Sequence, residues 1–237
     1  MVNNDPKKVP VITIDGPGGA GKGTLSQLLA RELGFHFLDS GALYRVLALA
    51  VDNHGISVDD DAALGVLAEH MDVQFKVNDS QSTPEIILEG EMVTQAIRQE
   101  FVGQLASKVA ANPVVRAALL SRQHSFREAP GLVADGRDMG TVVFKDATLK
   151  IFLTASVQER AQRRYKQLKK NGSDVSLARL EEAIIVRDEQ DMNRVVAPLK
   201  PAEDSLVIDS THLSIEGVFQ QVLKAARERL AMWNKES

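Results

Sequence analysis

The sequence predicts an α/β fold in which a mostly parallel sheet is flanked by helices on both faces. Two observations support this fold. Short apolar runs typical of buried strands alternate along the chain with longer segments of helical periodicity. A glycine-rich stretch, Gly16–Thr24, joins the first predicted strand to the first predicted helix. The length of 237 residues suits one large domain, or one domain that carries inserted subdomains.

The predicted elements follow one another in that alternating order. Val9–Ile14 is a short apolar run that ends in Asp15 and a glycine-rich turn, so we expect a buried strand there. Three further buried strands are predicted at Leu132–Asp135, Leu149–Leu153 and Leu206–Asp209. Helical spacing of apolar residues predicts five helices: Thr24–Leu33, Gly41–Asn53, Ser156–Lys170, Leu177–Asn193 and Ser214–Met232.

The stretch from Asp59 to Asn112 breaks this alternation. It holds a helix candidate, two short strand candidates at Val73–Val77 and Glu85–Leu88, and a polar turn at Asn78–Pro84. We therefore expect an insertion into the α/β core. A sheet tolerates such an insertion because the entropy cost of closing a loop grows slowly with its length.

The bulk composition excludes several classes of function. The formal net charge of −4 gives no global basic field that would attract a nucleic acid polymer. The absence of cysteine excludes disulfides, thiolate metal sites and cysteine nucleophiles. The chain starts with polar residues and has no apolar run near the roughly 18 residues of a membrane span. We expect a cytoplasmic protein that acts on neither membranes nor nucleic acid polymers.

The glycine-rich stretch has the residues and the context of a P-loop. Its glycines let backbone N–H groups converge on phosphates, and the following helix adds the partial positive charge of its N-terminus. We expect Lys22, in a solvent-facing loop, to reach the β and γ phosphates of a nucleoside triphosphate, and Thr24 to offer its hydroxyl to Mg²⁺. The alternative is an ordinary glycine-rich turn. The predicted ATP-binding residues are Gly16, Pro17, Gly18, Gly19, Ala20, Gly21, Lys22, Gly23 and Thr24.

Two further motifs carry side chains that could bind a phosphate-bearing ligand beside the P-loop. Asp39-Ser-Gly-Ala-Leu-Tyr-Arg45 places Tyr44 and Arg45 near the start of a helix, where Arg45 can hold a phosphate with two hydrogen bonds. Asp135-Gly-Arg-Asp-Met-Gly140 ends a strand, which is where ligands bind in open α/β sheets. Its two aspartates and one arginine suit a phosphate and metal site. The alternatives are a surface arginine in the first motif and a structural turn in the second.

Two predicted helices carry stripes of charged residues. Arg160, Arg163 and Arg164 lie at spacings of three and four, and such a cluster repels itself unless an anion lies between its members. A transferring phosphoryl group is such an anion. The next helix carries a mixed stripe at spacings of four and three: Arg187, Asp191 and Arg194. For both stripes the alternative is a solvent-exposed helix face.

Together these segments resemble the bacterial, long-form cytidylate kinases, a family of P-loop nucleoside monophosphate kinases. The resemblance covers nearly the whole chain and rests on five segments: Val11-Ile-Thr-Ile-Asp-Gly-Pro17, Leu38-Asp-Ser-Gly41, Ala134-Asp-Gly-Arg-Asp-Met-Gly-Thr-Val-Val143, Asn193-Arg-Val-Val-Ala-Pro198 and Asp209-Ser-Thr211. It implies transfer of a phosphoryl group from ATP to CMP or dCMP, in pyrimidine nucleotide metabolism. ATP, CMP and dCMP would be the partners of a monomer, with Mg²⁺ as cofactor. In the P-loop, Gly23 stands between Lys22 and Thr24, as in nucleoside monophosphate kinases.

The resemblance also implies a role for each candidate residue. The cytosine would be read by Ser40, Arg116 and Asp138, and the ribose would be surrounded by Ser107, Arg187 and Asp191. The acceptor phosphate would be held by Arg45, Arg137 and Arg194, with Tyr44 also on the CMP side. Asp135 would position that phosphate or a magnesium-bound water, and Arg160 and Arg164 would close over the triphosphate.

The family further implies three parts within one domain. A CORE would comprise about residues 9–40, 112–156 and 175–232. An inserted monophosphate-binding subdomain would cover about 41–111, and a short LID about 157–174, ending in the turn Asn171-Gly172-Ser173.

Two other functions remain open from the residues alone. The first is another small P-loop kinase, such as a shikimate kinase or a dephospho-coenzyme A kinase. The second is a nucleotide-binding switch with no acceptor. The guanine-reading pattern Asn-Lys-x-Asp of GTPase switches is absent, since the only Asn-Lys, Asn234-Lys235, is followed by Glu236 and Ser237.

Overall fold

The computed structural model describes residues 9–76, 85–170 and 175–236. The chain divides into two compact units. The first, here called the sheet unit, comprises Met1–Leu38 and Phe126–Ser237, and the second, the inserted unit, comprises Asp39–Ser125. The expected turns at Asn78–Pro84 and Asn171–Ser173 lie outside the described residues.

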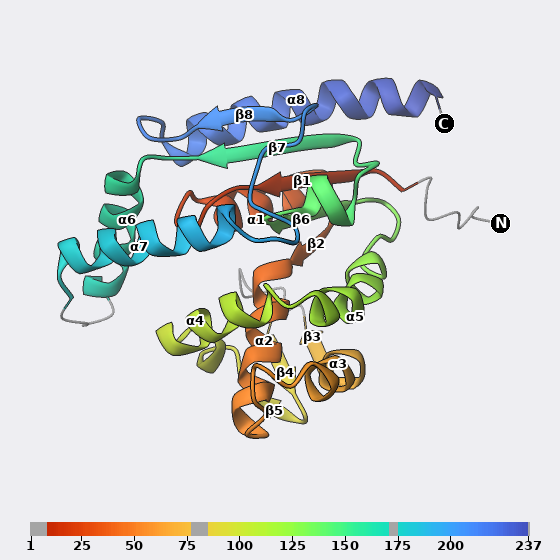
Figure 1. The fold of residues 1–237 in the computed structure, drawn as a ribbon. Coiled ribbons are helices and arrows are strands. Elements are labelled where there is room, and N and C mark those ends of the chain that lie inside the picture. The colour runs from red at the N-terminus through yellow and green to blue at the C-terminus, as the bar shows by residue number, and fades with distance from the viewer. Residues whose placement is uncertain (1–8, 77–84, 171–174, 237) are drawn as a thin grey trace. The chain divides into compact units, whose positions relative to one another are not determined.

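A five-stranded sheet with the order β2-β6-β1-β7-β8 forms the centre of the sheet unit (Figure 1). Its strands are β1 (Val11–Asp15), β2 (His36–Asp39), β6 (Leu132–Gly136), β7 (Leu149–Thr154) and β8 (Leu206–Asp209). β1 pairs in parallel with β6 and β7, and β7 pairs in parallel with β8. All five residues of β1 and of β6 are buried, as expected for central parallel strands covered on both faces.

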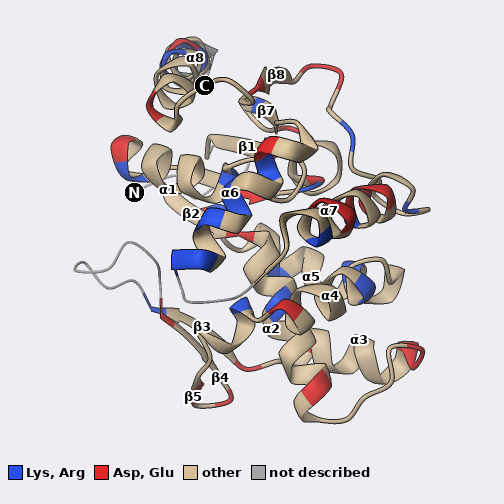
Figure 2. Ribbon diagram, turned by 90° about the vertical axis from the view of Figure 1, so that its left-hand side faces the viewer, with Lys and Arg blue, Asp and Glu red and all other residues tan. Residues whose placement is uncertain are grey.

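Helices cover both sides of this sheet. They are α1 (Lys22–Leu33), α6 (Val157–Lys170), α7 (Leu177–Met192) and α8 (Ile215–Glu236), and a π-helical turn, η3 (Met139–Val143), follows β6. α1 and α8 pack on one side through Leu25, Leu29, Val218 and Val222, whereas α7 lies on the opposite side (Figure 2). α6 packs against α7, and it begins three residues after the carboxyl end of β7.

The inserted unit is built around α2. Its elements are α2 (Ser40–Asn53), α3 (Asp61–His70), β3 (Val73–Lys76), β4 (Glu85–Leu88), β5 (Glu91–Met92), η2 (Ala96–Arg98), α4 (Glu100–Val109) and α5 (Pro113–His124). β3, β4 and β5 form a small antiparallel sheet. α2 begins with Asp39 as its N-cap, whose side chain accepts from Ala42 N at 2.9 Å, and it is buried along nearly its whole length.

The predicted fold class is confirmed, and so are the four predicted strands of the sheet and the two predicted strands of the insertion. The sequence did not predict β2, β5, η2, η3, α4 or α5. Contacts place the boundary of the inserted unit at Asp39, well before the break in pattern at Asp59, because α2 packs mainly with α4 and η2. No helix in the described ranges combines the length and the apolarity needed to cross a membrane.

Gly16, which joins β1 to the P-loop, offers a test of this packing. Its φ of +148° disfavours other residues, and a Cβ there would lie 1.9 Å from the carbonyl oxygen of Leu153 on β7. We expect Gly16→Ala to lower the free energy of unfolding several-fold more than Gly34→Ala, in a urea titration. Gly34 is the matched control, because it also has a positive φ (+65°) but an added Cβ there would meet open space. Gly34→Ala should therefore cost about 1–2 kcal/mol. Equal losses would contradict the close approach of the two strands.

Candidate functional site

The P-loop of the sheet unit wraps around the side chain of Lys22. Gly19 and Gly21 have φ angles of +79° and +98°, which turn the backbone back on itself before α1 begins. Lys22 Nζ donates to the carbonyl oxygen of Pro17 at 3.0 Å and lies 3.8 Å from Asp135 Oδ1. Lys22 was expected in a solvent-facing loop, but its own side chain is buried, with only 6% exposed. The loop therefore holds a cation in place rather than on a mobile arm.

Three arginines from other elements reach the same loop. Arg160 on α6 donates to the carbonyl oxygens of Gly18 (3.1 Å) and Ala155 (3.0 Å). Arg163 donates to the carbonyl oxygen of Ala20 at 3.2 Å. A Cβ on Gly18 would lie 3.4 Å from Arg137 Nη2, so Arg137 also lies close to the loop. Local positive charge thus surrounds the P-loop of a chain whose net charge is negative, and α6 carries much of it (Figure 2).

Two carboxylates on α7 hold these arginines. Asp188 accepts from both terminal nitrogens of Arg160, and Asp191 accepts from Arg137 Nε at 2.9 Å and from Arg194. Burial by itself would raise the pKa of Asp191, but the attraction of Arg137 and Arg194 outweighs it and holds that pKa below its usual value. Asp191 therefore stays ionised.

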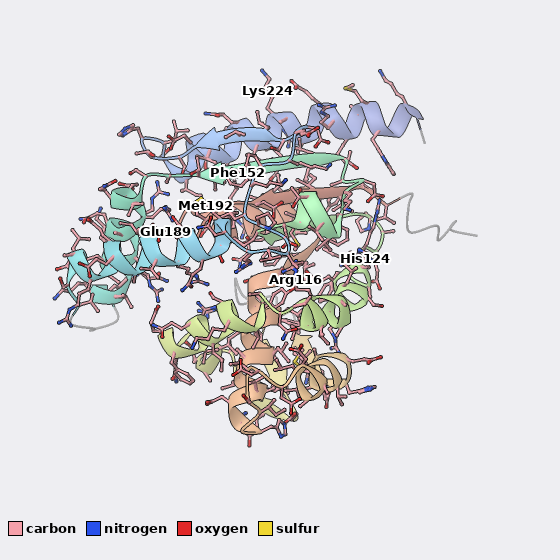
Figure 3. All side chains as sticks on the ribbon, in the orientation of Figure 1. Arg116, His124, Phe152, Glu189, Met192 and Lys224 are labelled. Carbon is pink, nitrogen blue, oxygen red and sulfur yellow. The ribbon has the colours of Figure 1, made fainter. Side chains whose placement is uncertain are left out.

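The buried face of α7 is defined by these aspartates. Asp191 is 1% exposed, so the alternative of a solvent-exposed stripe does not hold for it. Glu189 and Met192, each one residue further along the helix and labelled in Figure 3, are exposed. Arg187 is partly buried on the same helix, and its charge also lowers the pKa of Asp191.

The arginines of α6 differ from the expected bare cluster of like charges. Arg160 pairs with Asp188, and Arg163 pairs with Glu159 at 2.9 Å. Arg163 also donates to the carbonyl oxygen of Ser210 at 2.7 Å, so it ties α6 to the end of β8. Arg164 donates to Gln167 at 3.1 Å on its own helix. Repulsion within the cluster is offset by acidic partners rather than only by a bound anion.

A carboxylate that sequence reasoning did not select lies directly before the P-loop. Asp15, the last residue of β1, accepts from the backbone N–H groups of Met139 and Gly140, both at 2.8 Å. These amides belong to the turn that carries Asp138, which is 3% exposed. Burial raises the pKa of Asp15 to about 6 against the lowering effect of the two N–H groups. The only sequence signal was an aspartate at the end of an apolar strand.

The inserted unit carries the remaining candidates in two places. Ser40, the first residue of α2, donates its hydroxyl to Gln123 Oε1 on α5 at 3.1 Å, and both side chains are buried. Arg116 on α5, labelled in Figure 3, stacks over the ring of Tyr44 with 5.9 Å between its guanidinium carbon and the ring centroid. It also donates to the carbonyl oxygen of Ala110 at 3.2 Å. Gln123 is a second residue that the sequence did not reveal.

Arg45 lies against the start of α4 in the same unit. It donates to the carbonyl oxygens of Ile97 (2.8 Å) and Gln99 (3.3 Å), and Gly103 leaves room for its guanidinium group, since a Cβ there would lie 2.6 Å from Nη2. Ser107, one turn further along α4, donates to the carbonyl oxygen of Gly103 at 3.2 Å. Arg45 and Ser107 therefore both lie close to Gly103 on α4.

The candidate residues therefore form two sets. The sheet unit holds its candidates on α1, on β6 and the turn after it, on α6 and α7, and directly after α7: Lys22, Asp135, Arg137, Asp138, Arg160, Arg187, Asp191 and Arg194. The inserted unit holds Ser40, Tyr44, Arg45, Ser107 and Arg116. Arg164 lies on α6 with the first set.

Oxygen ligands for a hard cation are present beside Lys22. Thr24 is an exposed residue on the first turn of α1, and a Cβ on Gly23 would lie 3.5 Å from Asp135 Oδ2, so Gly23 leaves space at that carboxylate. Within the described ranges, no group of three or more His, Asp or Glu side chains forms a metal cage. A hydroxyl and one carboxylate suit Mg²⁺ that keeps most of its water and phosphate ligands.

A parallel sheet, a P-loop at the start of its first helix and arginines around that loop define the class of P-loop phosphotransferases. The sequence profile of the family described as cytidylate kinase matches residues 12–228. The cytidylate kinase of Stutzerimonas stutzeri (strain A1501) is 65% identical over 94% of this chain and 97% of its own. That of Aeromonas salmonicida (strain A449) is 60% identical over 95% and 97%. The chain belongs to the cytidylate kinase family.

Among solved structures, a gluconokinase from Sinorhizobium meliloti 1021 aligns with a TM-score of 0.47 at 14% identity, over 96% of this chain and 98% of that one.

The raised pKa of Asp15 predicts a pH-dependent difference between the wild type and Asp15→Asn. Between pH 4 and 6 the folded state keeps a proton on Asp15 that the unfolded chain has released. The wild type should therefore lose stability relative to Asp15→Asn as pH rises through this range, by up to about 3 kcal/mol. Urea titrations of both proteins at pH 4, 5, 6 and 7 measure the difference, in which the other titrating groups cancel. A difference that does not change with pH would contradict the shift.

Proposed function

We propose that this protein phosphorylates CMP and dCMP with ATP, giving CDP or dCDP and ADP. One observation carries the proposal: Lys22, Arg137, Arg160 and Arg163 all lie at a P-loop in a chain of the cytidylate kinase family. Such a concentration of fixed cations suits a transferring phosphoryl group, whose charge is spread over its equatorial oxygens.

On the donor side, the P-loop backbone N–H groups and Lys22 bind the β and γ phosphates of ATP. Arg160 and Arg164 on α6 close over the triphosphate from a LID of about residues 157–174. Arg160 is already held at the carbonyl oxygen of Gly18 by Asp188, so it needs little reorganisation on binding. Closure would exclude water, which would otherwise accept the phosphoryl group.

On the acceptor side, Arg45, Arg137 and Arg194 hold the phosphate of CMP, and Asp135 positions it. Ser107, Arg187 and Asp191 surround the ribose. The cytosine is read by Ser40, Arg116 and Asp138, with Tyr44 behind the guanidinium of Arg116. The monophosphate-binding subdomain of about residues 41–111 supplies Tyr44, Arg45 and Ser107 in this proposal, and the CORE supplies the rest.

The chemical step needs positioning rather than a strong base. An ionised oxygen of the CMP phosphate attacks the γ-phosphorus, a new P–O bond forms, and the bond to the leaving ADP breaks in line. Mg²⁺ bound at Thr24, with Asp135 through water, would neutralise charge on the phosphates. Lys22 and the arginines hold donor and acceptor in line and stabilise the transferring group. The proposal also places the enzyme in the cytoplasm as a monomer.

A coupled assay of ATP consumption against CMP, dCMP, UMP, AMP, GMP and shikimate tests this function. CMP and dCMP should support the highest kcat/KM, and omission of the acceptor should leave little ATP turnover. Preference for a non-nucleotide acceptor, or ATP turnover that is independent of any acceptor, would refute the proposal.

Lys22→Ala should lower kcat by roughly 100- to 1000-fold, as for loss of one preorganised donor in other active sites. Lys200→Ala, which removes an exposed lysine of the same unit, is the matched control and should retain full activity. Because Lys22 is buried beside Asp135, both variants must melt cooperatively before their rates are compared. Wild-type turnover by a folded Lys22→Ala protein would remove this loop from the chemistry.

Asp138→Asn should lower kcat/KM for CMP and bring the ratio of kcat/KM for CMP to that for UMP closer to one. An ionised carboxylate accepts from the N4 amine of cytosine but meets the O4 lone pairs of uracil, whereas an amide can donate to O4. One such polar pair is worth roughly 1–3 kcal/mol, or about one to two powers of ten in the ratio. An equal factor of loss in kcat/KM for CMP and UMP would show that Asp138 only stabilises the turn on which it lies.

A further inference from the structure

Asp15 has a geometry that the proposed mechanism does not use. Its carboxylate is buried at the end of β1, and each oxygen accepts one backbone N–H, from Met139 to Oδ1 and from Gly140 to Oδ2. These amides are the two that directly follow Asp138. The next residue after Asp15 is Gly16, where the P-loop begins. One carboxylate thus joins the strand that leads into the donor loop to the turn that carries a predicted base-reading residue.

The two hydrogen bonds fix how the turn leaves β6. η3 is a single π-helical turn, in which Val142 and Val143 both donate to the carbonyl oxygen of Asp138. Its first two N–H groups have no partner within the turn, as at any helix start. Asp15 binds both, and β1 and β6 are already in register, with Asp15 opposite Gly136. The backbone around Asp138 is therefore fixed from outside its own segment.

A carboxylate suits this position better than an amide. Two N–H groups that point to two separate oxygens need an acceptor at each, and only an ionised carboxylate has acceptors at both. An asparagine would place its NH₂ group against one of the N–H groups. Burial of the charge carries a cost, seen in the pKa of about 6, so the position keeps an anion that packing alone would not favour.

We propose that Asp15 is a positioning residue for base selection: by binding the N–H groups of Met139 and Gly140 it fixes Asp138 in the orientation that distinguishes cytosine from uracil. This inference rests on the proposed base-reading role of Asp138. It assigns to the strand that precedes the P-loop a part in recognition of the acceptor, in addition to its place in the sheet.

The test compares Asp15→Asn with Thr13→Val by the ratio of kcat/KM for CMP to that for UMP. Thr13 lies on the same strand and near the same turn, since a Cβ on Gly140 would lie 2.8 Å from Thr13 Oγ1. Its buried hydroxyl has no hydrogen-bond partner among the described residues, so Thr13→Val removes no such bond. The ratio should fall about fivefold or more in Asp15→Asn, within the range for one polar contact, and should stay unchanged in Thr13→Val.

The outcomes separate this inference from the proposed function. Suppose that Asp138→Asn narrows the ratio, whereas Asp15→Asn lowers kcat/KM for CMP and for UMP by the same factor. Asp15 then only supports the fold, and the inference is wrong. If Asp138→Asn itself leaves the ratio unchanged, the base-reading role fails and the inference fails with it. A ratio that falls equally in Thr13→Val and Asp15→Asn would show a general disturbance of the strand and would also overturn it.

Should Asp15→Asn not fold, the wild type supplies the test through its pH dependence. The charged groups that act on Asp15 are Asp138 on the turn and Lys22 on α1. The strands beside β1 carry Asp135 on β6 and Lys150 on β7, which pairs with Asp204. The amide proton chemical shifts of Met139 and Gly140 should change together with a midpoint near pH 6. The ratio of kcat/KM for CMP to that for UMP should decrease as the pH is lowered through the same midpoint. Protonation of the acceptor phosphate affects CMP and UMP alike, so it does not change this ratio. Amide shifts that titrate while the ratio stays constant would overturn the inference.

Discussion

Two carboxylates on α7, the buried Asp191 and the half-buried Asp188, hold the arginines around the P-loop, and the proposed phosphoryl transfer depends on them. Guanidinium groups close to one another repel, and long side chains lose entropy when they are fixed. The two-point pairing of Asp188 with Arg160, and the contacts of Asp191 with Arg137 and Arg194, offset both costs. In the proposed mechanism the cations are thus in place before a triphosphate binds, as electrostatic stabilisation of a transferring group requires.

The same arrangement links several elements of the sheet unit. Arg160 joins α6, α7 and the P-loop through Asp188 and the carbonyl oxygen of Gly18, and Arg163 joins α6 to the end of β8. Asp15 links β1 to the turn after β6 in a comparable way, at a cost in stability near neutral pH. Buried ion pairs of this kind stabilise a fold little by themselves, because desolvation opposes their attraction. Their value here lies in the fixed geometry of charged groups.

Much of the fold could be predicted because its signals are local. Apolar runs identified β1, β6, β7 and β8, and the glycine pattern identified the P-loop. β2 was missed because it is only four residues long, begins three residues after the end of α1, and has a single fully buried residue, Leu38. Residue types also identified Lys22, Asp135 and Asp191. The roles of Asp15 and Asp188 could not be predicted, because their partners lie 124 and 28 residues away and only tertiary packing brings them together.

A double-mutant cycle on Asp191 and Arg137, measured as kcat/KM for dCMP, tests most directly whether the carboxylates of α7 act through the arginines. dCMP lacks the 2′-hydroxyl that Asp191 could otherwise bind, so this substrate removes that contact and leaves those with Arg137 and Arg194. If Asp191 acts by holding the arginines, Asp191→Asn and Arg137→Met should each lower kcat/KM, and the double variant should be little worse than the more damaged single one. Losses that multiply in the double variant would contradict this role for Asp191.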